Sequence, residues 1–165
     1  MRTINRKAEK KHNQNFDPFI SQAQYQKYEK QLAKLKKESP FLRDEVARLA
    51  LLGDFSENVE YQIAKSKLRS ANHKILKLET LLNQSQIISD DTDNELVKLG
   101  KTVTLETNGE IKKYQILGSQ ESDPSKNIIS QNSPLGQNLL GKKVGEKIEI
   151  ILKDKKIIYK IISID

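Results

Sequence analysis

The sequence of 165 residues contains no cysteine and no tryptophan, and it has only two histidines. Without cysteine, a disulfide framework and a thiolate metal site are both excluded. With two histidines, a multi-histidine metal centre and a histidine-based catalytic triad are close to excluded. No apolar run approaches the roughly 20 residues that span a bilayer, and the amino-terminal residues lack the apolar segment of a secretory signal. We therefore expect a small cytoplasmic protein that has no membrane partner.

Basic residues outnumber acidic residues by 29 to 22, and the excess is uneven along the chain. Residues 1–15 hold five Lys or Arg residues against one Glu, which we interpret as a disordered basic arm. Such an arm is either simply solvated or weakly attracted to nucleic acid. Residues 89–97 carry only acidic charges among small polar residues, which indicates a linker between two domains at 16–88 and 98–165.

Apolar residues recur at alternating steps of three and four along two runs of the first domain. One run extends from Tyr25 to Leu49 and the other from Tyr61 to Leu82. This repeat is typical of a coiled coil, because it keeps one apolar seam facing a partner helix. The short connection between the runs predicts an antiparallel coiled-coil helical hairpin with its tip at residues 53–58.

Local signals refine the first helix of this hairpin. Ser21 is the expected N-cap, and Gly53 is the expected helix breaker. Pro40 should bend the helix without ending it, since the apolar repeat continues in register on both sides. A helix over residues 21–52 would be about 48 Å long, so the tip should project far from the rest of the molecule. A scaffold or dimerisation coiled coil is the alternative.

Acidic residues recur every third position around the tip, at Asp54, Glu57 and Glu60. A capping box and favourable interaction with the helix dipole would explain them. Alternatively, their carboxylates are the hard oxygen ligands that Mg²⁺ prefers. The second helix then carries a basic flank, which consists of Lys65, Lys67 and Arg69. This flank either contacts a polyanion or is simply a solvated helix face.

The second domain changes to a period of two. Val103 and Leu105 alternate with polar residues, and Asn108-Gly109 predicts a type I′ hairpin turn. Ser133-Pro134 is the expected start of a short helix that ends before Gly141. The chain as a whole is therefore predicted to be α+β, with the hairpin followed by a small antiparallel sheet domain that carries one short helix.

Two motifs make the sequence resemble a known family. Residues 53–61, Gly-Asp-Phe-Ser-Glu-Asn-Val-Glu-Tyr, resemble the Gly-Asp-x-x-Glu-Asn-x-Glu-Tyr tip motif of bacterial Gre-type transcript cleavage factors, the GreA/GreB family. Residues 130–146 resemble the second signature of that family, and residues 20–32 fit its opening helix. The likeness covers residues 16–165 and leaves the basic arm outside it. It also implies an FKBP-like fold for the second domain.

The resemblance implies a transcription elongation factor that is not itself an enzyme. The hairpin of such factors enters the secondary channel of RNA polymerase after the polymerase has backtracked and extruded the 3′ end of the nascent RNA. Asp54 and Glu57 would be the catalytic carboxylates, completing a second Mg²⁺ site shared with the polymerase, whose own active site then cleaves the RNA. The alternative is a non-catalytic secondary-channel regulator with the same architecture.

The resemblance also implies roles for neighbouring residues. The basic flank would contact RNA, and six residues would support the tip motif: Gly53, Phe55, Ser56, Asn58, Glu60 and Tyr61. The expected polymerase-docking segment is Ser133, Pro134 and Leu135, for which helix capping alone is the alternative. The protein is expected to be a monomer that binds no Mg²⁺ stably by itself. The residues just before the turn, Leu49-Ala50-Leu51-Leu52, stand where many family members have a polar or basic residue. The flank is also more basic than in many GreA-like proteins, which leaves the subtype open.

Overall fold

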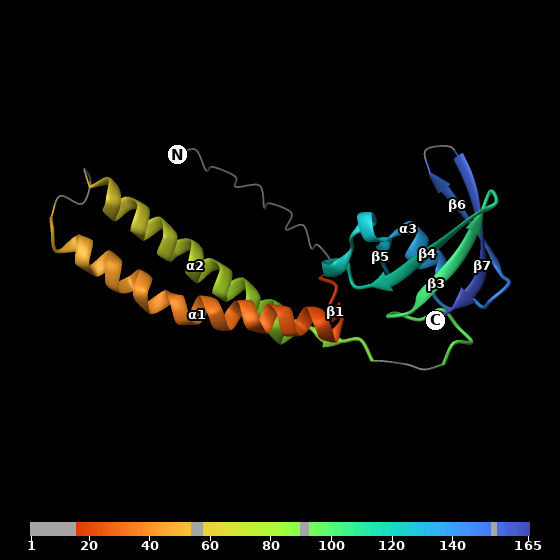
Figure 1. Cartoon of the computed structure of the whole chain (residues 1–165), viewed down its shortest axis with the longest axis horizontal. Helices are drawn as coiled ribbons and strands as arrows, with labels where there is room; N and C mark the ends of the chain where they lie inside the picture. The colour runs from red at the N-terminus through yellow and green to blue at the C-terminus, as the bar shows by residue number, and fades with distance from the viewer. Residues whose placement is uncertain (1–15, 54–57, 90–92, 153–154) are drawn as a thin grey trace, which may run out of the picture.

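The computed structural model describes residues 16–53, 58–89, 93–152 and 155–165. It consists of a long helical hairpin followed by a curled mixed sheet with a short helix (Figure 1). The basic arm predicted at residues 1–15 lies outside the described residues. Within the part of the chain that is described, no helix combines the length and the apolar character needed to cross a membrane.

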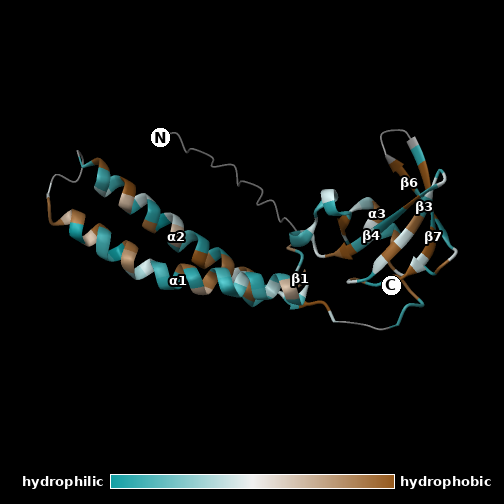
Figure 2. Ribbon diagram, viewed as in Figure 1, coloured by the Kyte–Doolittle hydropathy of each residue, from teal (hydrophilic) through white to brown (hydrophobic). Residues whose placement is uncertain are grey.

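The hairpin pairs α1 (Gln22–Ala50) with α2 (Val59–Gln84). Every seam position predicted from Tyr25 to Leu49 and from Tyr61 to Leu82 is buried or half-buried, whereas all charged residues of α1 are exposed. Apolar and hydrophilic positions accordingly alternate along both ribbons in Figure 2. Burial of this one apolar stripe against its partner is what holds the two helices together.

The first helix begins and continues as the sequence predicts. Ser21 caps it, since its Oγ accepts a hydrogen bond from the Gln24 N–H at 3.2 Å. The helix also continues through Pro40 to Ala50.

Polar contacts also link the two helices. Ser39 is buried in the seam, and its Oγ donates a hydrogen bond to Asn72 Oδ1 at 3.4 Å. Nearer the base of the hairpin, Lys36 Nζ lies 2.6 Å from Glu79 Oε1. A polar residue in an apolar seam lowers stability but restricts the register of the helices. The Ser39–Asn72 contact therefore favours one alignment of α1 on α2.

The sheet has the strand order β5-β4-β3-β7-β6. Its strands are β3 (Thr102–Thr107), β4 (Glu110–Leu117), β5 (Ile128–Ser130), β6 (Lys147–Leu152) and β7 (Lys155–Ile164). The predicted hairpin turn between β3 and β4 is confirmed, because Asn108 and Gly109 both have positive φ, at 49° and 82°. β5 runs parallel to β4, so the sheet is mixed rather than wholly antiparallel. Two 3-10 helices form the crossover between these strands, η1 (Ser119–Glu121) and η2 (Pro124–Lys126).

A single apolar core lies between the sheet and α3 (Pro134–Leu139). Its nine buried members are Val97, Val103, Leu105, Ile116, Leu139, Ile148, Ile150, Ile161 and Ile164. Val97, which the sequence places at the end of the linker, is thus part of this core, and its N–H donates to the Lys142 carbonyl at 2.8 Å. The packed structure of the second domain therefore begins before residue 98.

The segment before α1 attaches the base of the hairpin to the sheet domain. Asp17 is 4% exposed, and its carboxylate accepts hydrogen bonds from five donors. The donors are the N–H groups of Phe19 and Ser119 and the side chains of Ser119, Gln131 and Asn132. A buried carboxylate is stable only when it is satisfied in this way, so Asp17 makes the position of the hairpin base depend on the sheet domain.

Two further contacts complete this junction, which we define as residues 17–21 with 86–87, 118–121 and 131–132. β1 (Phe19–Ile20) pairs in parallel with β2 (Gln86–Ile87), which follows α2. The Ser21 N–H and Oγ each donate to the Glu121 carboxylate at 2.6 Å. The junction was not foreseen from the sequence, because its partners lie about a hundred positions apart and follow no repeat.

Candidate functional site

The candidate site is the tip that joins α1 to α2. Asp54, Phe55, Ser56 and Glu57 lie outside the described residues, so their predicted roles stay predictions. The helix ends that flank them lie at the end of the hairpin away from the sheet domain (Figure 1). With 29 residues, α1 is about 43 Å long. The described helix ends on either side of residues 54–57 therefore lie at the end of a long arm.

Gly53 ends the first helix as predicted. Its φ is +76°, a left-handed conformation that residues with a Cβ rarely adopt, and its N–H donates to the Ala50 carbonyl at 3.3 Å. Among the described residues other than its chain neighbours, no atom lies within 4 Å of the position that a Cβ on Gly53 would occupy. The glycine is thus required by backbone conformation and not by lack of space.

Asn58 starts the second helix. Its Oδ1 accepts a hydrogen bond from the Tyr61 N–H at 3.1 Å, and its carbonyl accepts one from the Gln62 N–H at 3.2 Å. A capping box built on Asp54 and Glu57 would require a helix that begins at residue 55, whereas α2 begins at Val59. The capping explanation for these two carboxylates therefore does not fit the observed helix start. Glu60 does lie in the first turn of α2, where the helix dipole favours it.

We expect Asn58→Ala to destabilise the start of α2 by about 1 kcal/mol, the usual cost of losing an N-cap acceptor. Hydrogen exchange at the amides of Tyr61 and Gln62 should become faster, and the urea midpoint of the hairpin should fall. Asn58→Ser is the matched control, because it keeps a capping oxygen. Equal exchange rates in the two variants would contradict the capping role.

The basic flank predicted on α2 is divided in the structure. Lys65, Lys67 and Arg69 are all exposed. Lys65 Nζ lies 5.7 Å from the centroid of the Tyr61 ring, a cation–π distance. Lys67 instead acts on Glu45 of α1, where its positive charge adds to a lowering of the carboxyl pKa that comes mainly from a hydrogen bond with Arg48. Only Lys65 and Arg69, four residues apart, therefore share one helix face.

The α1 side of the tip carries one strong polar pair and an apolar patch. Arg48 donates to Glu45 through Nε at 3.0 Å and Nη2 at 2.9 Å, and this pairing raises the pKa of Arg48. Next along the chain, Leu51 is 87% exposed and Leu52 is 67% exposed. The residues that depart from the family pattern thus place unburied apolar side chains directly before the tip.

The expected docking segment caps α3. Ser133 Oγ accepts a hydrogen bond from the Gly136 N–H at 3.0 Å and donates one to the Ser130 carbonyl at 2.7 Å. Pro134 is the first residue of the helix and is exposed, while Leu135 packs against the sheet core. Helix capping explains the presence of Ser133, and core packing explains the presence of Leu135. A role of this segment in docking on a polymerase stays a prediction.

A metal ion at the tip would need ligands from a second molecule. Over residues 16–53, 58–89, 93–152 and 155–165, no group of three or more Asp, Glu, His or Cys side chains could hold a metal. Asp54 and Glu57 fit Mg²⁺ by their chemistry, since both offer carboxylate oxygens. Two carboxylates are too few for the six ligands of an octahedral Mg²⁺ ion, so the rest must come from water or from a partner.

Comparison with family models and curated proteins agrees over most of the chain. Residues 18–87 match the model described as transcription elongation factor, N-terminal, and residues 92–165 match transcription elongation factor GreA/GreB, C-term. Transcription elongation factor GreA of Bacillus subtilis is 37% identical over 144 residues, covering 84% of this chain and 90% of the relative. GreA of Thermotoga maritima is 35% identical over 129 residues, covering 76% and 83%.

Two solved structures show a low level of similarity to this chain. The crystal structure of GreA factor homolog 1 of Thermus thermophilus is 23% identical and covers 91% of this chain and 99% of that chain, with a TM-score of 0.43. A GreA/GreB factor from Nitrosomonas europaea is 19% identical and covers 73% and 93%, with a TM-score of 0.41.

Proposed function

Because this chain belongs to the GreA/GreB family of transcription elongation factors, we propose that it stimulates bacterial RNA polymerase to cleave backtracked nascent RNA. The observation that supports this most directly is the position of the family tip motif. Residues 53–61 lie at the end of a helical arm about 43 Å long. An arm of this length suits delivery of a few side chains into a cavity of another molecule.

Asp54 and Glu57 are the side chains to be delivered. Together with ligands from the polymerase they would hold the second Mg²⁺, and such an ion supplies activation of water and stabilisation of the departing oxygen. The chain contributes two carboxylates and their placement, while RNA binding and bond cleavage belong to the polymerase. It is therefore a cofactor of that enzyme and not an enzyme by itself.

Gly53 and Asn58 act as positioning residues in this proposal. Gly53 ends α1 in a left-handed conformation, and the Asn58 side chain caps α2. Both ends of the four-residue tip are thus held by interactions within the hairpin.

A cleavage assay tests the proposal. Purified RNA polymerase is stalled and backtracked on a template with radiolabelled nascent RNA, and RNA lengths are followed with and without the chain. We expect faster release of a short 3′ fragment and renewed extension after nucleotides are added. Binding that blocks extension without cleavage would support the non-catalytic regulator instead, and the absence of any effect would contradict both.

The basic flank of α2 leads to a prediction in which the size of the effect depends on how far the polymerase has backtracked. Lys65→Glu combined with Arg69→Glu should slow cleavage of deeply backtracked complexes by up to about thirtyfold, since each of the two exposed ion pairs with RNA contributes at most about 1 kcal/mol. Complexes backtracked by a few nucleotides should be less affected, because little RNA is extruded. Lys67→Glu is the control, since Lys67 does not share the helix face of Lys65 and Arg69. Equal losses on short and long backtracks would count against a role in RNA contact.

A further inference from the structure

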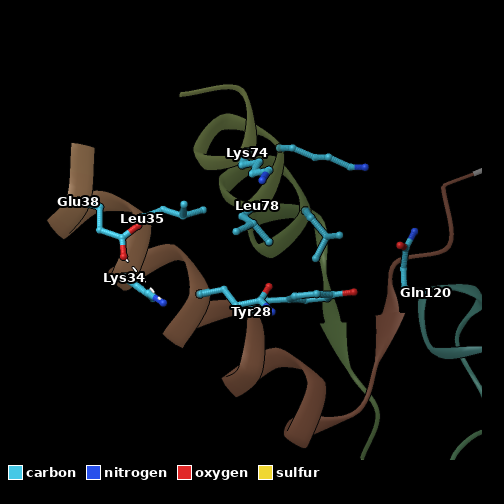
Figure 3. A pocket seen from close by; sticks show the side chains of 10 residues that line it. Tyr28, Lys34, Leu35, Glu38, Lys74, Leu78 and Gln120 are labelled. Atoms are coloured by element: carbon cyan, nitrogen blue, oxygen red, sulfur yellow. Dashed lines mark ion pairs between the residues drawn. The ribbon is translucent and has the colours of Figure 1, made fainter. Parts of the chain in front are cut away.

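A groove with a volume of 540 Å³ lies near the base of the hairpin, far from the tip (Figure 3). Its apolar surface comes from both helices, through Tyr28 and Leu35 of α1 and through Leu78 and Leu81 of α2. Gln120 of η1 closes one end, and the Tyr28 side chain extends toward it in Figure 3. The groove is therefore built jointly by the hairpin and the sheet domain.

The rim of this groove is cationic. Lys74 and Lys77 are exposed on α2, and among the described residues no carboxylate lies within ion-pair distance of either one. On the α1 side, Lys34 Nζ lies 3.8 Å from Glu38 Oε1, so the one acidic side chain of the rim is already paired. A second hollow of 590 Å³ shares Lys77, Leu81 and Gln120 with the first and extends the same surface around α2.

We propose that this base groove binds an acidic amphipathic helix of RNA polymerase, an inference that rests on the proposed function. A groove between two antiparallel helices accepts a third helix, whose apolar residues at every third or fourth position enter the groove. The apolar surface matches such residues, and the unpaired lysines match Asp or Glu on the flanks of the same helix.

Two other occupants fit the groove less well. Residues 1–15 lead directly to the described chain at Phe16, but their five basic residues against one Glu would be repelled by the lysine rim. Single-stranded RNA is anionic, but proteins that bind it combine a basic groove with several aromatic side chains on which successive bases stack. Tyr28 is the one aromatic residue of the groove, and the other apolar contacts are leucines.

The position of the groove separates it from the cleavage chemistry. The α1 residues that line the groove run from Tyr28 to Glu38 and lie 21 to 11 residues before Leu49, which corresponds to about 31 to 16 Å along the helix. A helix bound in the groove would therefore lie outside the cavity that the tip enters. It would set how tightly the arm is held without touching the reacting atoms.

The first experiment measures affinity and chemistry separately. Fluorescently labelled chain is titrated with purified RNA polymerase, and cleavage is then measured at saturating chain. We expect Lys74→Glu with Lys77→Glu to weaken the Kd at least about tenfold and to leave saturated cleavage unchanged. Lys27→Glu with Lys30→Glu is the matched control, because these lysines have the same spacing on α1 but line a hollow without leucines.

The outcomes distinguish this proposal from the proposed function. Equal affinity for the Lys74/Lys77 variant and wild type, with cleavage intact, would overturn the groove proposal and leave the cleavage role standing. Equal weakening by both charge-reversal variants would also overturn it, since general cationic attraction would then suffice. A wild-type chain that does not bind polymerase would overturn both proposals.

A second experiment identifies the occupant. A photoreactive amino acid replaces Gln31, which lines the groove, and the chain is crosslinked to a backtracked elongation complex. We expect the crosslink, located by mass spectrometry, on a polymerase segment that carries several Asp or Glu residues. A crosslink to nascent RNA, to residues 1–15 or to a second copy of the chain would overturn the proposal.

Discussion

The double variant Asp54→Asn/Glu57→Gln should lose the stimulation of RNA cleavage, with a decrease of about a hundredfold at saturating chain. Loss of an electrostatic group at an active site typically has an effect of this size. The amides keep the size of the side chains but remove both negative charges, and a neutral amide oxygen is a weaker ligand for Mg²⁺ than a carboxylate. The measurement is the cleavage rate of a defined backtracked complex at several Mg²⁺ concentrations.

The same variant should fold and bind as the wild type does. Gly53 and Asn58 hold the helix ends, and the seam starts beyond the tip, so circular dichroism, the urea midpoint and the Kd for polymerase should not change. Glu60→Gln is the matched control, since Glu60 belongs to the same motif but lies in the first turn of α2. If the double variant stimulates cleavage at the wild-type rate, Asp54 and Glu57 do not hold the metal ion. If Glu60→Gln loses as much stimulation as the double variant, the effect is not specific to Asp54 and Glu57.

Gly118→Ala should separate the hairpin base from the sheet domain. A Cβ on Gly118 would lie 1.7 Å from the Phe19 carbonyl oxygen and 2.8 Å from its carbon, so backbone on one side must move. Overpacking of this kind costs about 1–3 kcal/mol, and movement of β1 would also break hydrogen bonds to Asp17. We expect faster hydrogen exchange at the amides of Ser21 and Ser119, and a larger radius of gyration in solution scattering.

Two measurements make this prediction specific to the junction. The helical content should stay constant, because the seam of α1 and α2 does not include Gly118, and chemical shifts in the β3–β7 core should persist. Ser122→Ala serves as the control, because Ser122 is an exposed position four residues further along the connection between β4 and β5. Unchanged exchange at Ser21 in Gly118→Ala would show that the junction does not depend on this close approach.

The features predicted from the sequence are those with a repeat or a local turn signal. The hairpin follows from the steps of three and four between Tyr25 and Leu82, and the turn at Asn108-Gly109 follows from its residue types. β5 was missed because three residues are too few to show a period and because its parallel pairing requires a crossover. The Asp17 contacts were missed for another reason, since no pattern links an acidic residue to donors more than a hundred positions away.

At the candidate site, the sequence identified the motif but left its physical explanation open. The choice between capping and metal binding depends on where α2 begins, and Asn58 became the cap only when the helix start was known. The basic flank is a different case, because the spacing of four residues already places Lys65 and Arg69 on one helix face and Lys67 on another. The start of α2, in contrast, could not be read from residue spacing, because Asn58, Asp54 and Glu57 are all residue types that cap helices.

The junction also has a consequence for the order of folding during synthesis. The helices contact each other through nearby sequence, so the hairpin can form as soon as α2 has left the ribosome. Asp17 must then wait for Ser119, Gln131 and Asn132, which are translated about a hundred residues later. A nascent chain halted between these points would carry a complete arm with an unsatisfied carboxylate at its root, and closure of that long loop should be the last step of maturation.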